Sequence, residues 1–527
     1  MNLPAGLPTL DPAYASDQAS GWMCAQLYDG LVQFDPELRI KPALARTWEI
    51  VDSGRTYVFH LRSDVQFHSD PAFGPDSTRR FVAEDVRHSF NRICDPAVAA
   101  KGFWIFNGKV AGIADFRAGQ TDAVSGFSAP DDSTFVIRLE RSFPPFLSTL
   151  AMAYAFVVPQ ELTEKYGKDF RSHPIGTGPF RFKSWNEGAS LILRRNPEYH
   201  ERDTSGARLP YVDAVQVRFI REKLTEFREL LQGKLDFVNG LDKSTKDEIF
   251  LPDGSIRPDY RDNYAFRIAP QLNTEFIGIN VDASTPAVRG HPLADRRVRQ
   301  ALNLAIDRES LVRHLLNGIG FPAHSGMVPP GMPAFDSVAV PGYRFDPDRA
   351  ARLLAEAGFP GGKGIPLLSL KSNPSYQAVM EFVQKSWERI GITVSIDNMD
   401  GSTLREMAAK GEINLWRASW IADYPDAENY LGLFFSGNIP PNGANRMRYA
   451  RPRYDSLFRA AYRATSDSLR DALYHDMDNL MLADAPVVLL YYDKILRIIS
   501  PRITGLETNA MNMLYLKRVR KAAPPAP

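Results

Sequence analysis

The sequence predicts a protein of class α/β that is built from several domains. With 527 residues, the chain is too long for one hydrophobic core, and its length favours about three domains. In the first half, short stretches of alternating apolar and polar residues, separated by turn residues, indicate strands. After about residue 270, strand-sized apolar stretches alternate with stretches of helical periodicity, which is typical of an α/β lobe.

In the first half, alternation predicts the strands and a shared apolar face predicts the helices. We expect strands at residues 57–62, 134–139, 191–193 and 215–220. A helix is expected from about residue 83 to 93, because Val86 and Phe90 recur one helical turn apart. The stretch 225–232 also has helical character, and Gly233 is a suitable end for it.

The second half has helices that begin at capping residues and end at glycine. Asp307 and Asp346-Pro347 are typical starts, and Gly358 and Gly391 are typical ends. We expect helices at about residues 296–306, 308–317, 347–357, 376–390, 402–411 and 469–481. We expect strands at residues 276–281, 392–396, 413–418 and 487–491.

Composition and missing motifs argue against several classes of function. Lys and Arg number 63 against 62 for Asp and Glu, and this balance argues against a nucleic-acid partner. No stretch approaches the ~18 consecutive apolar residues of a membrane span. The spacings His-Glu-x-x-His, Cys-x-x-Cys and Gly-x-Ser-x-Gly are absent. We therefore expect no metal site, no cofactor and no catalytic residues.

The segment 417–426 brings a cation, an aromatic ring and an anion together. Arg417 precedes Trp420, and Asp423 follows Trp420 by three residues, where a predicted strand leads into a loop. A zwitterion such as a short peptide needs a carboxylate for its ammonium end and a guanidinium for its carboxylate end. Taken alone, the segment favours an ordinary surface ion pair beside a half-buried Trp, so the rest of the chain decides.

A series of short motifs along the chain has a characteristic order. They include Leu10-Asp11-Pro12, Gly176-Thr177-Gly178-Pro179-Phe180 and residues 26–31, 42–49, 57–62, 65–68, 83–86, 195–199, 296–308 and 353–358. In this order and at these separations, the motifs resemble the bacterial extracellular solute-binding proteins of family 5, the peptide and nickel receptors of ABC importers. The resemblance covers essentially the whole chain and is strongest to the oligopeptide receptors.

The resemblance implies a periplasmic-binding-protein-like α/β fold (type II, cluster C), with two lobes, an extra inserted domain and a ligand cleft between the lobes. Domain I would be assembled from residues 1–43, 175–267 and 493–527. Domain II would comprise residues 44–174, and domain III, the α/β lobe, residues 268–492. The ligand would be enclosed between domains I and III by a hinge motion.

The resemblance also assigns roles to the segment that contains Asp423. Asp423 falls on the position whose carboxylate pairs with the ammonium of a bound peptide. Trp420 would form a wall near the first peptide residue. Arg417 matches an arginine that meets the carboxylate end of some peptides, although a purely structural role explains it equally well.

Further contacts are implied on other segments. Asn273, Thr274 and Phe276 match a stretch that lies along the peptide, on the strand that enters domain III. Trp22 and Trp104 are further candidates, for which plain packing is at least as good an explanation.

The resemblance leads us to expect a binding receptor rather than an enzyme. The receptor would capture oligopeptides or dipeptides in a closing cleft and deliver them to the membrane permease subunits of an ABC importer. We expect a monomer in the periplasm or at the outer face of the cytoplasmic membrane, although no export signal is visible in the sequence. The alternatives are a receptor of the same fold for another solute, such as a nickel chelate, an opine or a sugar, or a hydrolase.

Overall fold

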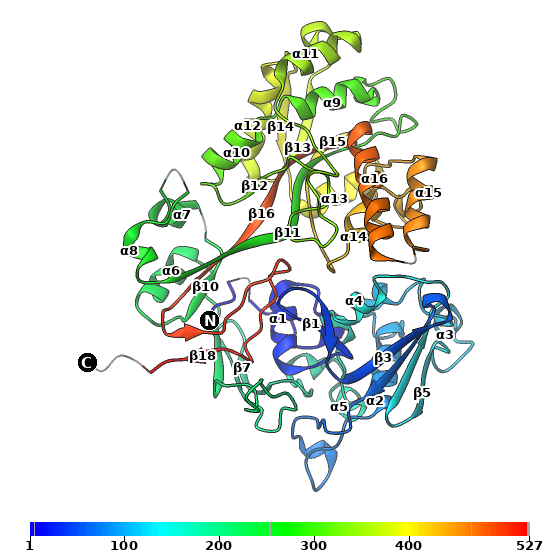
Figure 1. Ribbon diagram of the computed structural model, residues 1–527, viewed down its shortest axis with the longest axis vertical. Coiled ribbons are helices and arrows are strands. Elements are labelled where there is room, and N and C mark those ends of the chain that lie inside the picture. Colours follow the sequence, from blue (N-terminus) through cyan, green and yellow to red (C-terminus); the bar gives the residue numbers. More distant parts are fainter. Residues whose placement is uncertain (5, 242, 252–253, 465, 524–527) are drawn as a thin grey trace. The chain divides into compact units, whose positions relative to one another are not determined.

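The computed structural model describes residues 1–4, 6–241, 243–251, 254–464 and 466–523, and these form two compact units (Figure 1). Unit 1 comprises Met1–Thr245, Pro258–Ile268 and Leu496–Pro527, and unit 2 comprises Lys246–Arg257 and Ala269–Ile495. The chain passes between the units after Thr245 and after Arg257, and again within the strands β11 (Ala265–Ile279) and β16 (Val487–Ile499). This division does not test the three expected domains, which stay a prediction.

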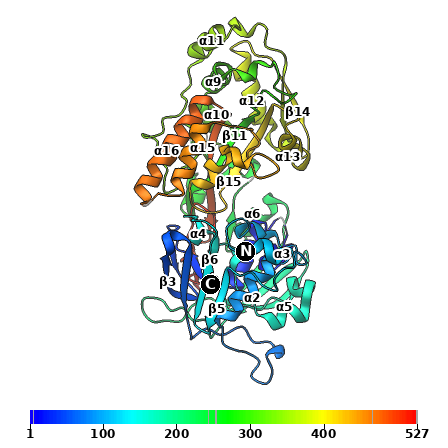
Figure 2. The same cartoon turned by 90° about the vertical axis from the view of Figure 1, so that its right-hand side faces the viewer.

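Unit 1 contains a four-stranded antiparallel sheet in the order β3-β4-β6-β5. Its strands are β3 (Ala45–Val51), β4 (Thr56–Leu61), β5 (Phe127–Asp131) and β6 (Thr134–Arg138). Tyr57, Phe59 and Leu61 alternate with more exposed residues along β4, so this strand buries one side as its sequence pattern predicts. The helix α2 (Ala83–Cys94) packs on β5 and β6 (Figure 2).

A second antiparallel sheet of unit 1 has the order β7-β8-β9. Its strands are β7 (Phe180–Asn186), β8 (Ser190–Arg195) and β9 (Ala214–Arg218). The smaller pairs are β1 (Val32–Phe34) with β2 (Ile40–Pro42) and β17 (Ile503–Thr504) with β18 (Arg520–Lys521). The other α-helices described in unit 1 are α1 (Gln18–Leu27), α3 (Ile113–Arg117), α4 (Phe146–Leu150), α5 (Gln160–Tyr166), α6 (Lys223–Leu231) and α8 (Pro258–Arg261), while α7 (Lys243–Ile249) continues from unit 1 into unit 2.

Among the described residues, the largest sheet has seven strands, in the order β10-β16-β11-β15-β13-β14, with β12 paired to β16 beside this path. The further strands of this sheet are β10 (Phe237–Asn239), β12 (Phe321–Pro322), β13 (Leu368–Ser372), β14 (Val394–Asn398) and β15 (Leu415–Ile421). The strand β15 is antiparallel to β11 and parallel to β13, which is itself parallel to β14. Unit 2 is therefore a mixed α/β unit, as predicted.

Helices cover one face of the sheet in unit 2 (Figure 1). They are α9 (Arg296–Leu304), α10 (Arg308–Leu315), α11 (Pro347–Glu356) and α12 (Gln377–Glu388). Their buried side chains, such as Leu302, Leu311 and Trp387, form one core with Ile277 and Ile279 of β11. The other helices of this unit are α13 (Gly401–Lys410), α14 (Glu428–Leu431), α15 (Pro452–Ala461) and α16 (Asp467–Asp484). None of the helices in the described ranges has the length and apolar character that a membrane crossing requires.

Two strands of this sheet are longer than the sequence pattern predicts. We expected residues 276–281 and 487–491, whereas β11 begins at Ala265 and β16 continues to Ile499. The added parts contain polar and charged residues, among them Glu275 and Asp493, which interrupt the apolar pattern.

Candidate functional site

Six of the eight predicted ligand contacts lie on β11, on β15 or in the loop that follows β15. The antiparallel register pairs Asn273 with Ile421, Thr274 with Trp420 and Ile277 with Arg417. Directly paired residues share a face of a sheet, and successive residues alternate between faces. Asn273 and Arg417 therefore lie on one face, while Thr274, Phe276 and Trp420 lie on the other.

The loop after β15 holds the carboxylate of Asp423 beside Trp420. One side chain, Asn429, organises this loop: its Oδ1 accepts from the Trp420 indole N–H at 2.9 Å and from the Asp423 backbone N–H at 3.1 Å. The Nδ2 of Asn429 donates to Asp423 Oδ2 at 3.3 Å. Trp420 and Asp423 are thus brought together, as the sequence predicts.

Asp423 has no positive partner among the residues of unit 2 that the structure describes. Among the described residues of unit 2, no cationic side chain forms an ion pair with it, and burial raises its pKa while the Asn429 amide offsets part of the rise. The neighbouring Asp426 differs, because it accepts from the Tyr474 hydroxyl at 2.9 Å and lies 3.6 Å from Arg470. A partly buried carboxylate without a counter-ion attracts a cation, so Asp423 is the better candidate for a ligand contact.

Arg417 is held by a residue that the sequence reasoning did not select. Its Nη2 and Nε donate to the Glu275 carboxylate at 2.7 and 3.1 Å, and only 11% of the Arg417 side chain is exposed. Its guanidinium also lies 3.3 Å from the ring centre of Tyr376, in the 3-10 turn η9 (Pro374–Tyr376). The positive charge of Arg417 is therefore balanced within the protein.

A second carboxylate, Asp493 of β16, joins this group through Asn273. The Asn273 Nδ2 donates to Asp493 Oδ2 and, at 3.3 Å, to Glu275 Oε1. Burial raises the pKa of Glu275 to about 7; Arg417 opposes the rise and Asp493 adds to it. Burial also raises the pKa of Asp493, against the attraction of Lys246 and Arg417.

The remaining candidates have structural contacts. Thr274 is fully buried and donates to the Met327 carbonyl at 2.9 Å, and Phe276 is buried as well. Trp22 and Trp104 belong to unit 1. Trp22 is packed in the core of that unit and donates to the Asn512 carbonyl at 2.7 Å.

Trp104 is partly exposed and packs edge-on against Tyr154. The described contacts of Trp22, Trp104 and Thr274 are structural and Phe276 is buried, and a role of any of the four in ligand binding stays a prediction.

Sequence reasoning missed Glu275, Asp493, Tyr376 and Asn429. For the two acids a signal exists, because a charged residue inside an otherwise apolar strand must find a partner or a ligand. No comparable signal marks Tyr376 or Asn429, which reach the site only through the fold.

The family model described as "Bacterial extracellular solute-binding proteins, family 5 Middle" matches residues 39–442. The chain belongs to this family. The glutathione-binding protein GsiB of Salmonella typhi is 29% identical over 504 residues, which cover 94% of this chain and 89% of that protein.

Solved structures of such receptors share the fold. The peptide-bound periplasmic binding protein DppA from Helicobacter pylori superposes with a TM-score of 0.75 and 25% identity, covering 98% of this chain and 96% of that chain. The Escherichia coli murein tripeptide binding protein MppA gives a TM-score of 0.73 at 23% identity, covering 99% and 98%. The protein therefore has the α/β fold of the periplasmic binding proteins of family 5.

Proposed function

We propose that this protein is the substrate-binding receptor of an ABC importer for short peptides, acting outside the cytoplasmic membrane. Family membership supports a solute receptor. Two findings support a peptide as the solute. The curated relatives are named for glutathione, which is a tripeptide, and a structure with the same fold contains the bound peptide STSA. The observation that carries the proposal is Asp423, a partly buried carboxylate that pairs with no cation among the described residues of its own unit.

Asp423 would bind the α-ammonium of the peptide. An ammonium loses its hydration when it is enclosed, and an uncompensated charge of this kind costs several kcal/mol. The Asn429 amide fixes the carboxylate, and the same Asn429 oxygen fixes the indole of Trp420. The carboxylate and the aromatic wall are thus positioned before the ligand arrives, which lowers the entropic cost of binding.

The predicted role of Arg417 at the carboxylate end of the peptide has weaker support. Its guanidinium already pairs with the Glu275 carboxylate. A ligand carboxylate would have to share or displace Glu275, and displacement would leave a buried anion without its partner. Our proposal therefore rests on Asp423 and not on Arg417.

Replacement of the carboxylate at Asp423 tests the proposal. We expect Asp423→Asn to weaken the binding of a free tripeptide such as Ala-Gln-Ala by more than ~10-fold, because a hydrogen bond to a charged group contributes roughly 1.5–3 kcal/mol. Isothermal titration calorimetry measures this change. N-acetylation of the peptide should weaken binding to the wild type to a similar extent, and acetylation should no longer matter in the variant.

Asp400→Asn is the matched control, since Asp400 is an exposed acid that caps the start of α13 and Asn caps helices equally well. Unchanged affinity of the free peptide for Asp423→Asn would remove Asp423 from the site.

A further inference from the structure

The face of β11 that carries Asn273 holds a charge imbalance. We use the term acidic cluster for Asn273, Glu275, Tyr376, Arg417 and Asp493, all of unit 2. Two carboxylates, of Glu275 and Asp493, stand against the single guanidinium of Arg417 in direct contact with Glu275. When both acids are ionised, the side chains in contact carry one uncompensated negative charge.

The hydrogen bonds of the acidic cluster do not remove this imbalance. The Nε and Nη2 atoms of Arg417 both donate to the Glu275 carboxylate, so the positive charge of Arg417 is paired with Glu275 and not with Asp493. Among the described residues, Asp493 receives its hydrogen bond from Asn273, which is a neutral donor. Lys246 attracts Asp493 electrostatically, yet burial still raises the pKa of Asp493. The anion is therefore stabilised less well than it would be in water.

Asn273 provides a separate sign that the acidic cluster is incomplete. Asn273 is only 4% exposed, and its amide nitrogen points to both carboxylates. Its Oδ1 is buried and has no hydrogen-bond partner among the described residues. A buried amide oxygen without a donor costs roughly 1–3 kcal/mol, and such orphaned groups are rare in native proteins unless something binds them.

The acidic cluster is not sealed from its surroundings. Glu275 and Asn273 are buried, whereas Asp493, Tyr376 and Arg417 are each partly exposed. A group placed beside Asp493 would lie close to the Asn273 amide, whose buried oxygen lacks a donor among the described residues. The ring of Tyr376 already has a guanidinium over it, so this aromatic surface tolerates positive charge.

We propose that the acidic cluster is a subsite for a cationic group of the ligand, namely the ammonium or guanidinium of a lysine-like or arginine-like side chain. A cation would neutralise the surplus charge at Asp493, and its N–H groups would supply the donor that Asn273 Oδ1 lacks. The inference rests on the proposed peptide-binding function and names a substrate class for it. It also reverses the expectation for this region, because a surplus of carboxylates repels the ligand carboxylate that Arg417 alone would attract.

Matched peptides test the inference on the wild-type protein. The peptides are Ala-Ala-Ala with one residue replaced in turn by Lys or by Gln, which gives three pairs of similar length and differing charge. We expect at least one Lys peptide to bind ~10-fold or more tightly than its Gln partner in calorimetry, as a charge-assisted contact predicts. Affinities within twofold of each other in all three pairs would overturn the inference while leaving the proposed function standing.

Asp493→Asn identifies the side chain responsible. The variant keeps the size of the residue, and the Lys-to-Gln affinity ratio should fall towards one. Asp400→Asn serves again as the control and should keep the wild-type ratio. A ratio unchanged in Asp493→Asn would place the cation elsewhere and reject the subsite.

A non-peptide probe separates the two proposals. Agmatine carries an ammonium and a guanidinium but no carboxylate or peptide bond. We expect millimolar agmatine to raise the thermal unfolding midpoint of the wild type and not that of Asp493→Asn. If no peptide binds but this difference is seen, the peptide function fails and the cationic subsite stands. If agmatine has no effect and no peptide binds, both fail.

Discussion

Glu275 is a carboxyl group whose protonation is set by the fold. It is 2% exposed and faces Arg417 from β15, Asp493 from β16 and Asn273 on its own strand. Tyr376 and Tyr491 also interact electrostatically with Glu275. Desolvation outweighs the guanidinium, so the folded protein holds a proton at Glu275 up to a pKa of about 7.

The raised pKa of Glu275 predicts a pH dependence of stability. The ordinary pKa is 4.5 and the folded value about 7, so the folded protein binds the proton more tightly than the unfolded chain does. The free energy of unfolding from this group therefore falls as pH rises from about 4.5 to 7. We expect a loss on the order of 2 kcal/mol across this window, seen as a lower urea midpoint at pH 7 than at pH 5.

In Glu275→Gln, which cannot ionise, the urea midpoint should change less over the same range. Equal pH profiles for the wild type and this variant would contradict the assignment of the raised pKa to Glu275.

Sequence patterns predict a helix or a strand correctly where a single local signal, such as a helix cap or an apolar stretch, determines it. The helix α11 begins at the cap Asp346 with Pro347 at its first position, and the structure confirms that start. The strands β11 and β16 are predicted too short, because their polar residues interrupt the apolar stretches on which the prediction depends. The positions of polar side chains that pair across strands depend on tertiary contacts, and a local sequence pattern carries no information about those contacts.

The same limit applies to the candidate site. The sequence segment containing Trp420 and Asp423 predicts that these residues lie close together, and the shared partner Asn429 confirms it. The pairing of Arg417 with Glu275 could not be predicted, since the two residues are 142 positions apart and meet only through the register of β15 on β11. The charge balance around Arg417 therefore depends on how β11 and β15 pair in the sheet, and the sequence of residues 417–426 alone does not determine it.

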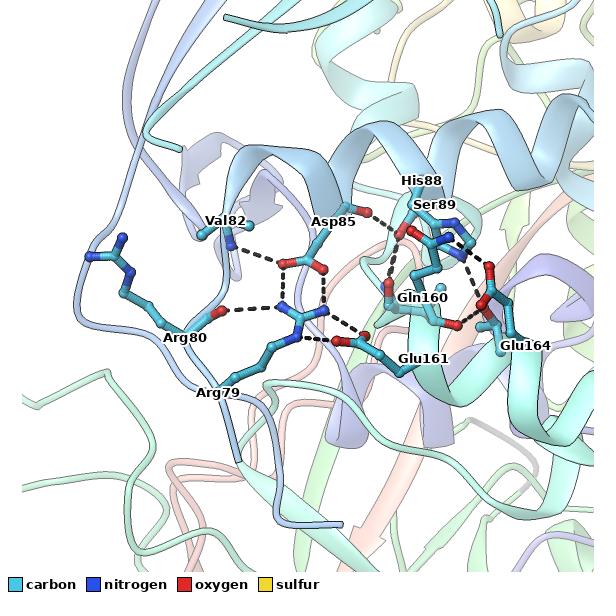
Figure 3. Close-up of polar contacts among 11 residues, drawn as sticks. Arg79, Arg80, Val82, Asp85, His88, Ser89, Gln160, Glu161 and Glu164 are labelled. Carbon is cyan, nitrogen blue, oxygen red and sulfur yellow. Dashed lines mark hydrogen bonds and ion pairs between the residues drawn. The ribbon is translucent and has the colours of Figure 1, made fainter. Parts of the chain in front are cut away.

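The side chain of Arg79 links the helices α2 and α5 through two ion pairs (Figure 3). Arg79 donates to Asp85 of α2 at 2.6 and 2.9 Å and to Glu161 of α5 at 2.6 and 2.7 Å. Asp85 is buried and also caps the start of α2 by accepting from the Val82 N–H at 2.9 Å. Loss of Arg79 would leave this buried carboxylate without its cation.

We expect Arg79→Met to lower the free energy of unfolding by roughly 2–4 kcal/mol, mostly through Asp85, because 41% of the Glu161 side chain is exposed against 4% of that of Asp85. Arg80→Met is the control, because the side chain of Arg80 forms an exposed ion pair with Asp132 at 3.3 Å, and the loss of this pair should cost less than ~1 kcal/mol. Urea denaturation measures both. Similar losses in the two variants would show that the pair linking α2 and α5 does not contribute as its geometry implies.

At the scale of the whole molecule, family membership determines the fold but not the ligand. The chain shares 29% of its residues with a glutathione-binding protein over almost its full length. The titratable groups of unit 2 in and around the proposed contacts are three carboxyl groups, Asp423, Glu275 and Asp493, with Arg417 and Lys246 as cations. When all three acids are ionised, their surplus of negative charge favours ligands of positive net charge.

Glutathione and its diethyl ester provide the sharpest comparison of these charges. Glutathione carries one ammonium and two carboxylates, whereas the ester keeps the ammonium and the skeleton and has no carboxylate. If Arg417 anchored a ligand carboxylate, glutathione would bind more tightly than the ester. Because Glu275 already balances Arg417, we expect the opposite order, with the ester binding ~10-fold or more tightly in competition against a labelled tripeptide. Tighter binding of glutathione would show that Arg417 leaves Glu275 to meet the ligand, and the acidic cluster would then be a binding site for anions.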